Sequence, residues 1–579
     1  MSVTALDPKA ASPPAGRPAG QETGMPARTV SEAAVAAALV AALVLVLVLI
    51  VALPLGTLLS KAFQNVDGHW VGLANFALYA STPSLIESLG NSIFVSSLST
   101  AIVVPLAFSY AYALQRSRIP AKGFFYAAAL LPVFAPSLMS ALALVYIFGN
   151  QGFLKHLLGD FTLYGPIGIV GAEVLYAFPH AVLILSTALA IADGRLYEAA
   201  EALGTTRGRI FRTVTLPGAR YGLISAAFVV FTLVITDFGI PKVIGGQYSV
   251  LATDAYKQVV GQQNFPMGAV VGMILLIPAI VAFFVDRRVR RRQVALLSAR
   301  AVPYVAKPRA ARDRALLAFV CLVAGTIIAT YGVALWGSFV TYWPYNLALT
   351  LANYDFANVD ADGWAPYVNS LILGSCVALF GTALVFSGAY LIEKTKTFPI
   401  GRALAQFLAM LPMAVPGLVL GLGYVFFFNA SWNPLSVFYG TLAILVVNTI
   451  AHYYTVAHIT SLTALKQIDG EFESVSASLK VPFWRTFARV TVPISAPAIL
   501  DIAVYLFVNA LTTISAVVFL YGADSKVASI AIVHMDEAGA IASAAAMGTI
   551  IMATAIGVKL LHLLLDRLVF VRLQAWRAR

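Results

Sequence analysis

Acidic, amide and hydroxyl side chains occur in this sequence at or within stretches that are otherwise long and apolar. An ionisable group at such a depth is costly to bury, so it is a candidate for contact with a solute or ion that crosses a membrane. The candidates are Glu173, Thr236, Asp237, Lys242, Asn448, Asn509, Thr512 and Thr513. The alternative is hydrogen bonding between neighbouring helices, which Ser, Thr and Asn often provide within membranes.

Two of these candidates admit a further choice. Lys242 lies at the outer end of its apolar stretch, where it could attract an anionic or zwitterionic solute or simply pair with Asp237. Asn448 and His452 lie one helical turn apart, but the seven histidines show no metal-ligand spacing such as H-E-x-x-H. Since Cys321 and Cys376 both fall in apolar runs, we predict no metal site and no disulfide.

The elements that must position these side chains are membrane-spanning helices. The 579 residues are 60% hydrophobic and 11% charged, whereas soluble domains carry about 25% charged residues. Apolar runs of roughly 20 residues, enough to cross a bilayer as a helix, recur along the chain. We predict an all-α polytopic membrane protein with twelve transmembrane helices. Their centres lie near Leu45, Val103, Ser137, Leu183, Val230, Leu275, Ala324, Val377, Gly417, Val447, Val508 and Ala555.

The distribution of positive charge fixes an orientation for these spans. With both termini in the cytoplasm, most of the 38 Lys and Arg residues fall in cytoplasmic segments, as the positive-inside rule requires. The outer segments hold Lys61, Lys155, Lys242, Lys257 and Lys526. The net charge of +12 is therefore a signal of topology and of contact with the lipid bilayer, and it requires no nucleic acid.

The sequence divides into two units, each with six spans. We predict a disordered cytoplasmic tail over 1–32, a first unit over 33–285, a basic cytoplasmic linker over 286–314, a second unit over 315–567 and a basic cytoplasmic tail over 568–579. Motifs of the first unit return 276 to 280 residues later in the second unit, which indicates a duplication. Since each unit has an even number of spans, the two are related by a pseudo-twofold axis along the membrane normal.

One repeated motif carries two prolines. Leu131-Pro132-x-x-x-Pro136 returns as Leu411-Pro412-x-x-x-Pro416. A proline within a helix removes a hydrogen-bond donor and clashes with the preceding turn. We therefore expect the third span of each unit to kink or break at this motif, most simply as a structural feature.

The polar segment 193–217, between two apolar runs, is predicted to form two short helices. Asp193 suits a helix N-cap, and Gly204 suits the left-handed residue that follows a helix. Thr206 can cap the second helix, and Pro217 should stop it before the next apolar run. On these residues alone an ordinary connecting loop is about as good an interpretation.

The residues Glu198-Ala199-Ala200, Gly204 and Leu216-Pro217 resemble, with the same spacing, the EAA loop of type I ABC-importer permeases. The resemblance implies two tandem six-helix permease units in a bacterial inner membrane. It implies that this loop docks on a cytoplasmic ATP-binding cassette subunit. It also implies two such subunits, which bind ATP and Mg²⁺, and a periplasmic solute-binding protein. The sequence contains no Gly-Lys pair and hence no Walker A motif, so this chain is not predicted to be an enzyme.

The second coupling loop, 469–493, departs from that pattern. Glu198-Ala199-Ala200 becomes Ser474-Val475-Ser476, with Glu473 one position before the aligned acid, whereas Pro493 keeps the position of Pro217. Lys480 stands where the first loop has Gly204, and a positive φ costs a non-glycine residue more. We expect the second loop to dock through different contacts.

The substrate is suggested by resemblance alone. Residues 236–246, 256–265 and 286–304 resemble fused permeases for 2-aminoethylphosphonate, which is the substrate we expect. Ferric-iron permeases, which are similar in plan and in a related Asp237-Phe238-Gly239 segment, are the alternative, and polyamine and sulfate permeases are more distant. A secondary transporter is an alternative of another class, but it would not need the Ala-rich loop. A membrane-embedded enzyme is a third class, but the sequence shows no cluster of catalytic groups that would support it.

Overall fold

The computed structural model describes residues 27–296, 302 and 304–570. The predicted N-terminal tail up to residue 26, most of the predicted C-terminal tail and part of the predicted linker lie outside these residues. Helix α1 begins at Ala27, inside the segment predicted as a tail. Helix α13 continues to Leu296 and α14 begins at Ala310, so helices also occupy much of the predicted linker.

The described chain is mostly helical, in two successive sets. The first unit contains α1 (Ala27–Leu47), α2 (Leu53–Lys61), α3 (Ala74–Ser81), α4 (Pro83–Arg116), α5 (Lys122–Leu130), α6 (Ser137–Phe148), α7 (Pro166–Ala190), α8 (Gly194–Ala202), α9 (Arg207–Ile210), α10 (Leu216–Thr236), α11 (Gly239–Ile244), α12 (Leu251–Tyr256) and α13 (Phe265–Leu296). The second unit contains α14 (Ala310–Ser338), α15 (Ala365–Cys376), α16 (Thr382–Lys394), α17 (Pro399–Met410), α18 (Gly417–Phe428), α19 (Leu442–Lys466), α20 (Glu471–Ser478), α21 (Phe483–Thr486), α22 (Val492–Ile494), α23 (Ala496–Thr512), α24 (Ala528–Glu537) and α25 (Ile541–Leu565).

Shorter elements join or extend these helices. Five-residue π-helical turns lie at Val48–Ala52, Phe211–Thr215, Lys257–Gly261, Val377–Gly381, Phe487–Thr491 and Asp566–Phe570. 3₁₀ turns lie at Leu131–Phe134, Lys155–Leu158, Ala352–Tyr354, Phe356–Asn358, Leu411–Ala414, Pro434–Phe438 and Ala523–Ser525. The described strands form one antiparallel hairpin, β1 (Val340–Tyr342) with β2 (Asn346–Leu349), outside the spans.

The predicted all-α membrane fold is confirmed. In the described part of the chain, nine helices are long and apolar enough to cross a membrane, and three bent helix pairs raise the number to twelve if each pair is one span. All twelve predicted centres fall on these helices or at the breaks within the bent pairs.

The repeated two-proline motif breaks the third span of each unit, as predicted. Residues Lys122–Phe134 and Ser137–Phe148 meet at 101°, and Pro399–Ala414 and Gly417–Phe428 meet at 116°. The break lies just before the second proline, where Ala135 and Val415 are extended. A residue before proline is pushed out of the helical region, so each break follows from the sequence.

Pro217 does not stop the second short helix, which corrects the prediction. Residues Arg207–Thr236 form one continuous helix through a π-helical turn at Phe211–Thr215. Pro217 lies directly after this π-helical turn, in which the Leu216 N–H bonds to the Phe211 carbonyl, so the helix continues past the proline where its hydrogen-bond pattern is already altered. In the second unit the corresponding helix does bend, by 77° after Ile494, next to Pro497, whose counterpart in the first unit is Tyr221.

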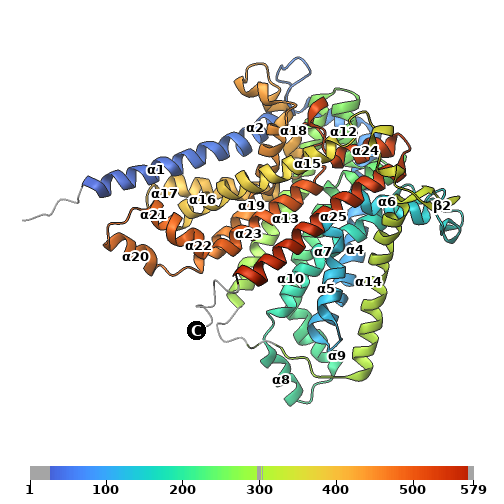
Figure 1. Cartoon of the computed structure of the whole chain (residues 1–579), viewed down its shortest axis with the longest axis horizontal. Helices are drawn as coiled ribbons and strands as arrows, with labels where there is room; N and C mark the ends of the chain where they lie inside the picture. Colours follow the sequence, from blue (N-terminus) through green and yellow to red (C-terminus); the bar gives the residue numbers. More distant parts are fainter. Residues whose placement is uncertain (1–26, 297–301, 303, 571–579) are drawn as a thin grey trace, which may run out of the picture.

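The first spans of the two units are exchanged. Helices α1 and α2 of the first unit pack against α16, α17 and α18 of the second, and α14 of the second unit packs against α4, α5 and α6 of the first (Figure 1). The Tyr424 hydroxyl donates to the Ile50 carbonyl over 2.6 Å, and the hydroxyls of Ser140 and Tyr331 lie 2.6 Å apart. Each six-span bundle is therefore completed by a helix of the other unit.

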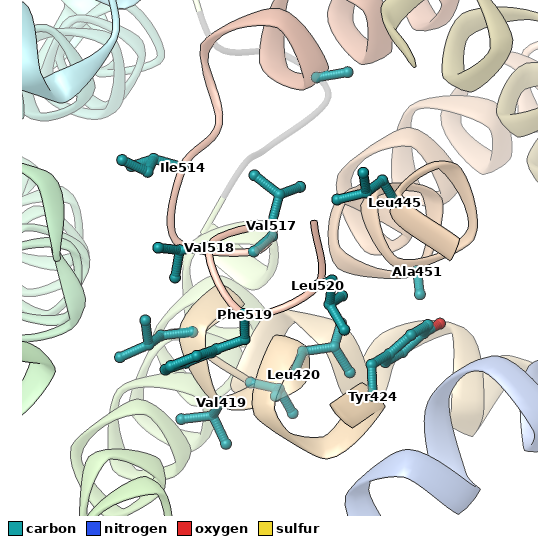
Figure 2. Close-up of a cluster of buried hydrophobic side chains, with 14 of the residues drawn as sticks. Val419, Leu420, Tyr424, Leu445, Ala451, Ile514, Val517, Val518, Phe519 and Leu520 are labelled. Carbon is teal, nitrogen blue, oxygen red and sulfur yellow. The ribbon is translucent and has the colours of Figure 1, made fainter. Parts of the chain in front are cut away.

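The core of the second unit encloses backbone that is not helical. After α23, residues 514–520 follow an irregular path and pack their apolar side chains against α18 and α19 (Figure 2). The Asn448 amide donates to the Ala516 carbonyl over 2.6 Å. A backbone carbonyl shielded from water must be satisfied within the protein, and Asn448 of α19 provides this partner for the irregular segment.

The exchanged first span predicts a sensitive position at Gly423. A Cβ at Gly423 would lie 2.7 Å from the Pro54 carbonyl oxygen, which belongs to backbone and cannot rotate away. We expect Gly423→Ala to destabilise the protein by about 1–3 kcal/mol, as overpacking does, and to lower the apparent melting temperature in detergent.

The matched control is Gly325→Ala in α14, where a Cβ would meet nothing within 4 Å. Because Ala is a better helix former than Gly, this variant should melt at or slightly above the wild-type temperature. Equal melting temperatures for the two variants would contradict the exchanged packing.

Candidate coupling surface and buried polar residues

Helix α8 is bounded as its sequence predicts. The Asp193 carboxylate accepts from the backbone N–H of Arg195 over 3.0 Å, and Gly204 has a φ of +67°. Thr206 occupies the N-cap of α9 without a side-chain capping bond. The short helix therefore has a defined start and a sharp bend after it, which fixes which of its faces is exposed.

Helix α20 begins and ends with the same backbone geometry as α8, although its residues differ. Asp469 accepts from the N–H of Glu471 over 3.0 Å, as Asp193 does in α8. Lys480 adopts a φ of +55°, so the bend after α20 uses the left-handed conformation in spite of the missing glycine. The backbone shape of the loop is thus preserved while its residues differ.

Both helices expose an apolar stripe that the sequence interpretation missed. In α8 the stripe contains Leu196 and Leu203, which are 59% and 83% exposed, with Ala199 between them. The residues 276 positions later, in the second loop, are Phe472, Val475 and Leu479, which are 41%, 56% and 70% exposed. Residues at this spacing share one helix face. Large apolar side chains repeated at this spacing in both loops were the available signal.

The other predicted coupling residues lie around these stripes. Glu198, Gly204 and Pro217 are exposed and Ala200 is half-buried in the first loop. Lys480 and Pro493 are exposed in the second loop. Glu473 differs, because it is half-buried and pairs with Lys394 over 3.0 Å.

Glu473 holds α20 against the membrane bundle. Its partner Lys394 ends α16, just as Arg116 ends α4. Arg116 lies 5.2 Å from the Tyr197 ring centre, and Tyr197 stands at the α8 position that corresponds to Glu473. A basic residue thus anchors each coupling helix, through an aromatic ring in the first unit and through a carboxylate in the second.

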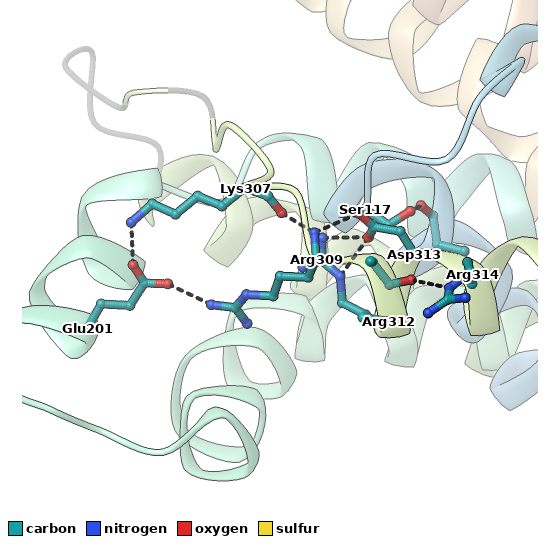
Figure 3. A network of polar contacts seen from close by, with 9 residues as sticks. Ser117, Glu201, Lys307, Arg309, Arg312, Asp313 and Arg314 are labelled. Carbon is teal, nitrogen blue, oxygen red and sulfur yellow. Dashed lines mark hydrogen bonds and ion pairs between the residues drawn. The ribbon is translucent and has the colours of Figure 1, made fainter.

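The linker adds a second set of contacts to α8 (Figure 3). Glu201 accepts from Lys307 over 2.5 Å and pairs with Arg309 over 3.4 Å. The hydrogen bond from Lys307 holds the pKa of the Glu201 carboxyl below its ordinary value. The Tyr304 ring packs 4.6 Å from that of Tyr197. The described linker residues therefore hold the inward side of α8 while its apolar stripe stays exposed.

Two acidic side chains of the first unit lie buried in the membrane bundle. Glu173 in α7 has no accessible surface, and neither of its carboxylate oxygens has a hydrogen-bond partner among the described residues. Asp237 is 6% exposed and accepts from the N–H of Ile240 over 2.8 Å at the start of α11. Asp237 therefore has a backbone partner, whereas neither oxygen of Glu173 has one among the described residues.

Asp237 and Thr513 occupy matching positions in the two units. Each directly follows the end of its helix, α10 or α23, with φ of −70° and an extended ψ. The hydroxyls of Thr236 and Thr512 and the amide of Asn509 bond to carbonyls of their own helices. The donor groups of these three residues are therefore used within their own helices.

Lys242 does not pair with Asp237. Its ammonium lies 2.5 Å from the Glu537 carboxylate in α24 of the second unit, and 5.1 Å from the centre of the Tyr256 ring. Helices α11 and α24 are in contact. This ion pair therefore joins the two units at the end of the molecule opposite α8 and α20.

The described residues contain no group of three or more His, Cys, Asp or Glu side chains that could hold a metal ion. His452 and His458 lie in α19, and His458 bonds to Gln406 over 2.9 Å. The arrangement thus offers two exposed surfaces for docking and two buried acidic side chains in the first unit.

Comparison with known proteins is consistent with this architecture. The family model described as "Binding-protein-dependent transport system inner membrane component" matches residues 103–294 and 385–571, once in each unit. The chain is 29% identical to the ferric transport system permease protein FbpB of Actinobacillus pleuropneumoniae, over 81% of this chain and 69% of that protein. It is also 29% identical to the putative ferric transport system permease protein FbpB 1 of Haemophilus influenzae, over 76% of this chain and 71% of that protein.

The match to a shorter relative covers less than one unit of this chain. The molybdenum transport system permease protein ModB of Escherichia coli is 30% identical over 26% of this chain and 66% of that protein. Two matches to one family model cover more than half of the residues. The chain therefore belongs to the family of binding-protein-dependent transport system inner membrane components, as a fused two-unit permease of a type I ABC importer.

Proposed function

We propose that this permease imports ferric iron. The observation that carries the proposal is the similarity to two ferric transport permeases that extends over 81% and 76% of the chain and so includes both units. Similarity to the molybdenum permease covers only 26% of the chain. A substrate assignment gains weight when the likeness includes both units, because the space between the units belongs to both.

The comparisons do not support the 2-aminoethylphosphonate substrate that the sequence interpretation preferred. The alternative of a ferric-iron permease fits them better. Two of the three segments that suggested a phosphonate, 236–246 and 256–265, include α11, the end of α10, the last residue of α12 and the π-helical turn Lys257–Gly261. They form the outer contact between the units, so they carry structural demands shared by permeases of different substrates.

In this proposal two ATP-binding subunits dock on α8 and α20, bind ATP with Mg²⁺, and hydrolyse it. The exposed stripes Leu196–Leu203 and Phe472–Leu479 support this, because apolar faces on short exposed helices are typical of interaction sites. A solute-binding protein docks at the opposite end, on the periplasmic side of the bacterial inner membrane. Both termini are then cytoplasmic.

The shape of the bundle supports an alternating-access cycle. The two units meet near α6, α12 and α24 and splay apart toward α8 and α20 (Figure 1). Closure of the ATP-binding subunits would bring the two coupling helices together and separate Lys242 from Glu537. The units then rock about their contact as rigid bodies and expose the space between them to the binding protein.

Charge in the exposed stripes should disrupt docking. Leu203→Asp and Leu479→Asp remove one apolar contact each, and loss of one buried leucine is worth about 1.5–3 kcal/mol, so affinity for the ATP-binding subunit should fall at least about 10-fold. Binding is measured with the full-length permease in nanodiscs. Comparison of the two variants also gives the contribution of each coupling helix.

The control is Thr206→Asp, which adds the same charge to the same loop outside the stripe. Thr206 is exposed and occupies an N-cap, a position that Asp also suits. Its affinity should match the wild type. Equal weakening by Thr206→Asp, or normal binding by both leucine variants, would show that the stripes are not the docking surface.

The substrate is tested by ATPase stimulation. The permease is reconstituted with its ATP-binding subunit, and a binding protein loaded with ferric ion or with 2-aminoethylphosphonate is added. We expect stimulation by the ferric-loaded protein alone, because only the correct complex drives the units outward. Stimulation by the phosphonate-loaded protein alone would reject ferric iron and restore the first substrate assignment.

A further inference from the structure

The second coupling loop is hydrogen-bonded to the first unit. The Glu32 carboxylate, in the second turn of α1, accepts from the backbone N–H of Phe483 over 2.7 Å. Phe483 is the first residue of α21, the helix that follows α20 in the second coupling loop. The two residues lie 451 positions apart in the chain. This contact therefore joins the start of the first unit to the coupling loop of the second.

The N–H groups at the start of α21 need an acceptor from outside the helix, because the first turn of a helix offers them none. The N-cap residue, Pro482, makes no side-chain bond to them. A carboxylate is a strong acceptor for such an N–H, and a charge-assisted hydrogen bond is about twice as strong as a neutral one. Glu32 thus supplies, from the other unit, an acceptor that the N-cap residue does not provide.

Phe483 is also held by its own unit. The Tyr390 hydroxyl of α16 donates to the Phe483 carbonyl over 3.3 Å. The Tyr390 ring lies 4.7 Å from that of Phe487, one turn further along the loop. Helix α1 itself packs against α16 and α17 (Figure 1). The start of α1 and the start of α21 are therefore attached to the same part of the second bundle.

Glu32 is the polar part of this attachment. Every residue of α1 from Ala33 to Leu47 is Ala, Val or Leu. Lipid tails are as apolar as these side chains, so the hydrophobic effect does not drive α1 onto its neighbours within the bilayer. The hydrogen bond from Phe483 to Glu32 adds a directional contact at the end of α1 that lies nearest the coupling loop.

The first coupling helix has a comparable attachment. Glu201 of α8 pairs with Lys307 and Arg309, which directly precede α14, the first span of the second unit. The Asp313 carboxylate accepts from the Arg309 N–H over 2.9 Å, which fixes Arg309 to the start of α14. Each coupling loop is thus attached to the place where the first span of the other unit begins, although the residues differ.

We infer that Glu32 is a positioning residue that ties the exchanged span α1 to the second coupling loop, so that α1 moves with the second unit when the ATP-binding subunits close. The moving bodies then differ from the two halves of the sequence, because α1 belongs to the first half by sequence and to the second unit by motion. The inference rests on the proposed docking of ATP-binding subunits on α8 and α20. It does not depend on which solute is transported.

Hydrogen exchange in the resting permease tests the contact itself. The full-length protein in nanodiscs, without partners, is compared with its variants. Glu32→Ala removes the acceptor, so exchange at the Phe483 N–H should rise at least about 10-fold, as expected for loss of a hydrogen bond to a charged group. Glu32→Gln keeps an acceptor oxygen and should recover most of the protection. Val35→Ala, at an exposed position one turn later in α1, should exchange like the wild type.

Spin labels measure the movement of α1 in a permease whose two cysteines are replaced by alanine. Labels are placed at exposed positions of α1, of α5 in the first unit and of α17 in the second: Leu39, Phe124 and Ile400. ATP with vanadate closes the bound ATP-binding subunits. We expect the Leu39–Phe124 distance to change and the Leu39–Ile400 distance to stay constant. In Glu32→Ala the Leu39–Ile400 distance should change as well.

A double variant separates attachment from helix capping. Glu32→Ala with Pro482→Asp places an N-cap acceptor within the loop, so protection of α21 should recover while the Leu39–Ile400 distance still changes on closure. Recovery of both would show that Glu32 is only a cap, and would overturn the inference. Unchanged exchange at Phe483 in Glu32→Ala would overturn it too, as would a wild-type α1 that keeps its distance to α5 and moves relative to α17.

Failure of the proposed docking would give a different result. If the ATP-binding subunit did not bind, no distance would change in any variant, and the docking on α8 and α20 would be rejected. Faster exchange at the Phe483 N–H in Glu32→Ala would then still support the attachment of α1 to the second coupling loop, because that measurement uses the permease alone.

Discussion

The absence of water inside a bilayer is the constraint on which this structure depends. Each backbone N–H and C=O at membrane depth needs a partner within the protein, so spans are helical and interruptions occur only where other elements cover them. The irregular residues 514–520 are enclosed by α18 and α19, and Asn448 satisfies the Ala516 carbonyl. Side chains are satisfied less strictly, and both oxygens of the buried Glu173 carboxyl lack a hydrogen-bond partner among the described residues.

The duplicated units solve one mechanical problem with different residues. Each coupling helix must be rigidly joined to its bundle, or motion of an ATP-binding subunit would be lost in the loop. The first unit uses Arg116 with Tyr197 and adds linker contacts, whereas the second uses Lys394 with Glu473. Duplication within one chain allows such divergence, because each copy mutates separately.

The sequence predicted those features that depend on local chemistry. Apolar length identified the spans, proline spacing identified the broken third spans, and Asp193 with Gly204 identified the ends of α8. The exchange of α1 and α14 between units could not be predicted, because it is decided by packing between distant helices. Pro217 failed as a stop signal because a π-helical turn directly before it lets the helix continue past the missing N–H. Lys480 adopts a positive φ in spite of its cost to a non-glycine residue, because the bend after α20 requires it.

The buried acidic side chains of the first unit also reflect divergence between the two copies. In a dimer of identical permeases, Glu173 and Asp237 would each occur twice around the axis, and four carboxylates at membrane depth would repel one another strongly. In the fused chain, Thr449 and Thr513 replace one copy of each acid while the backbone stays the same. In a one-chain permease, acidic side chains can thus be present in one unit and absent from the matching positions of the other, while the backbone of the two units stays similar.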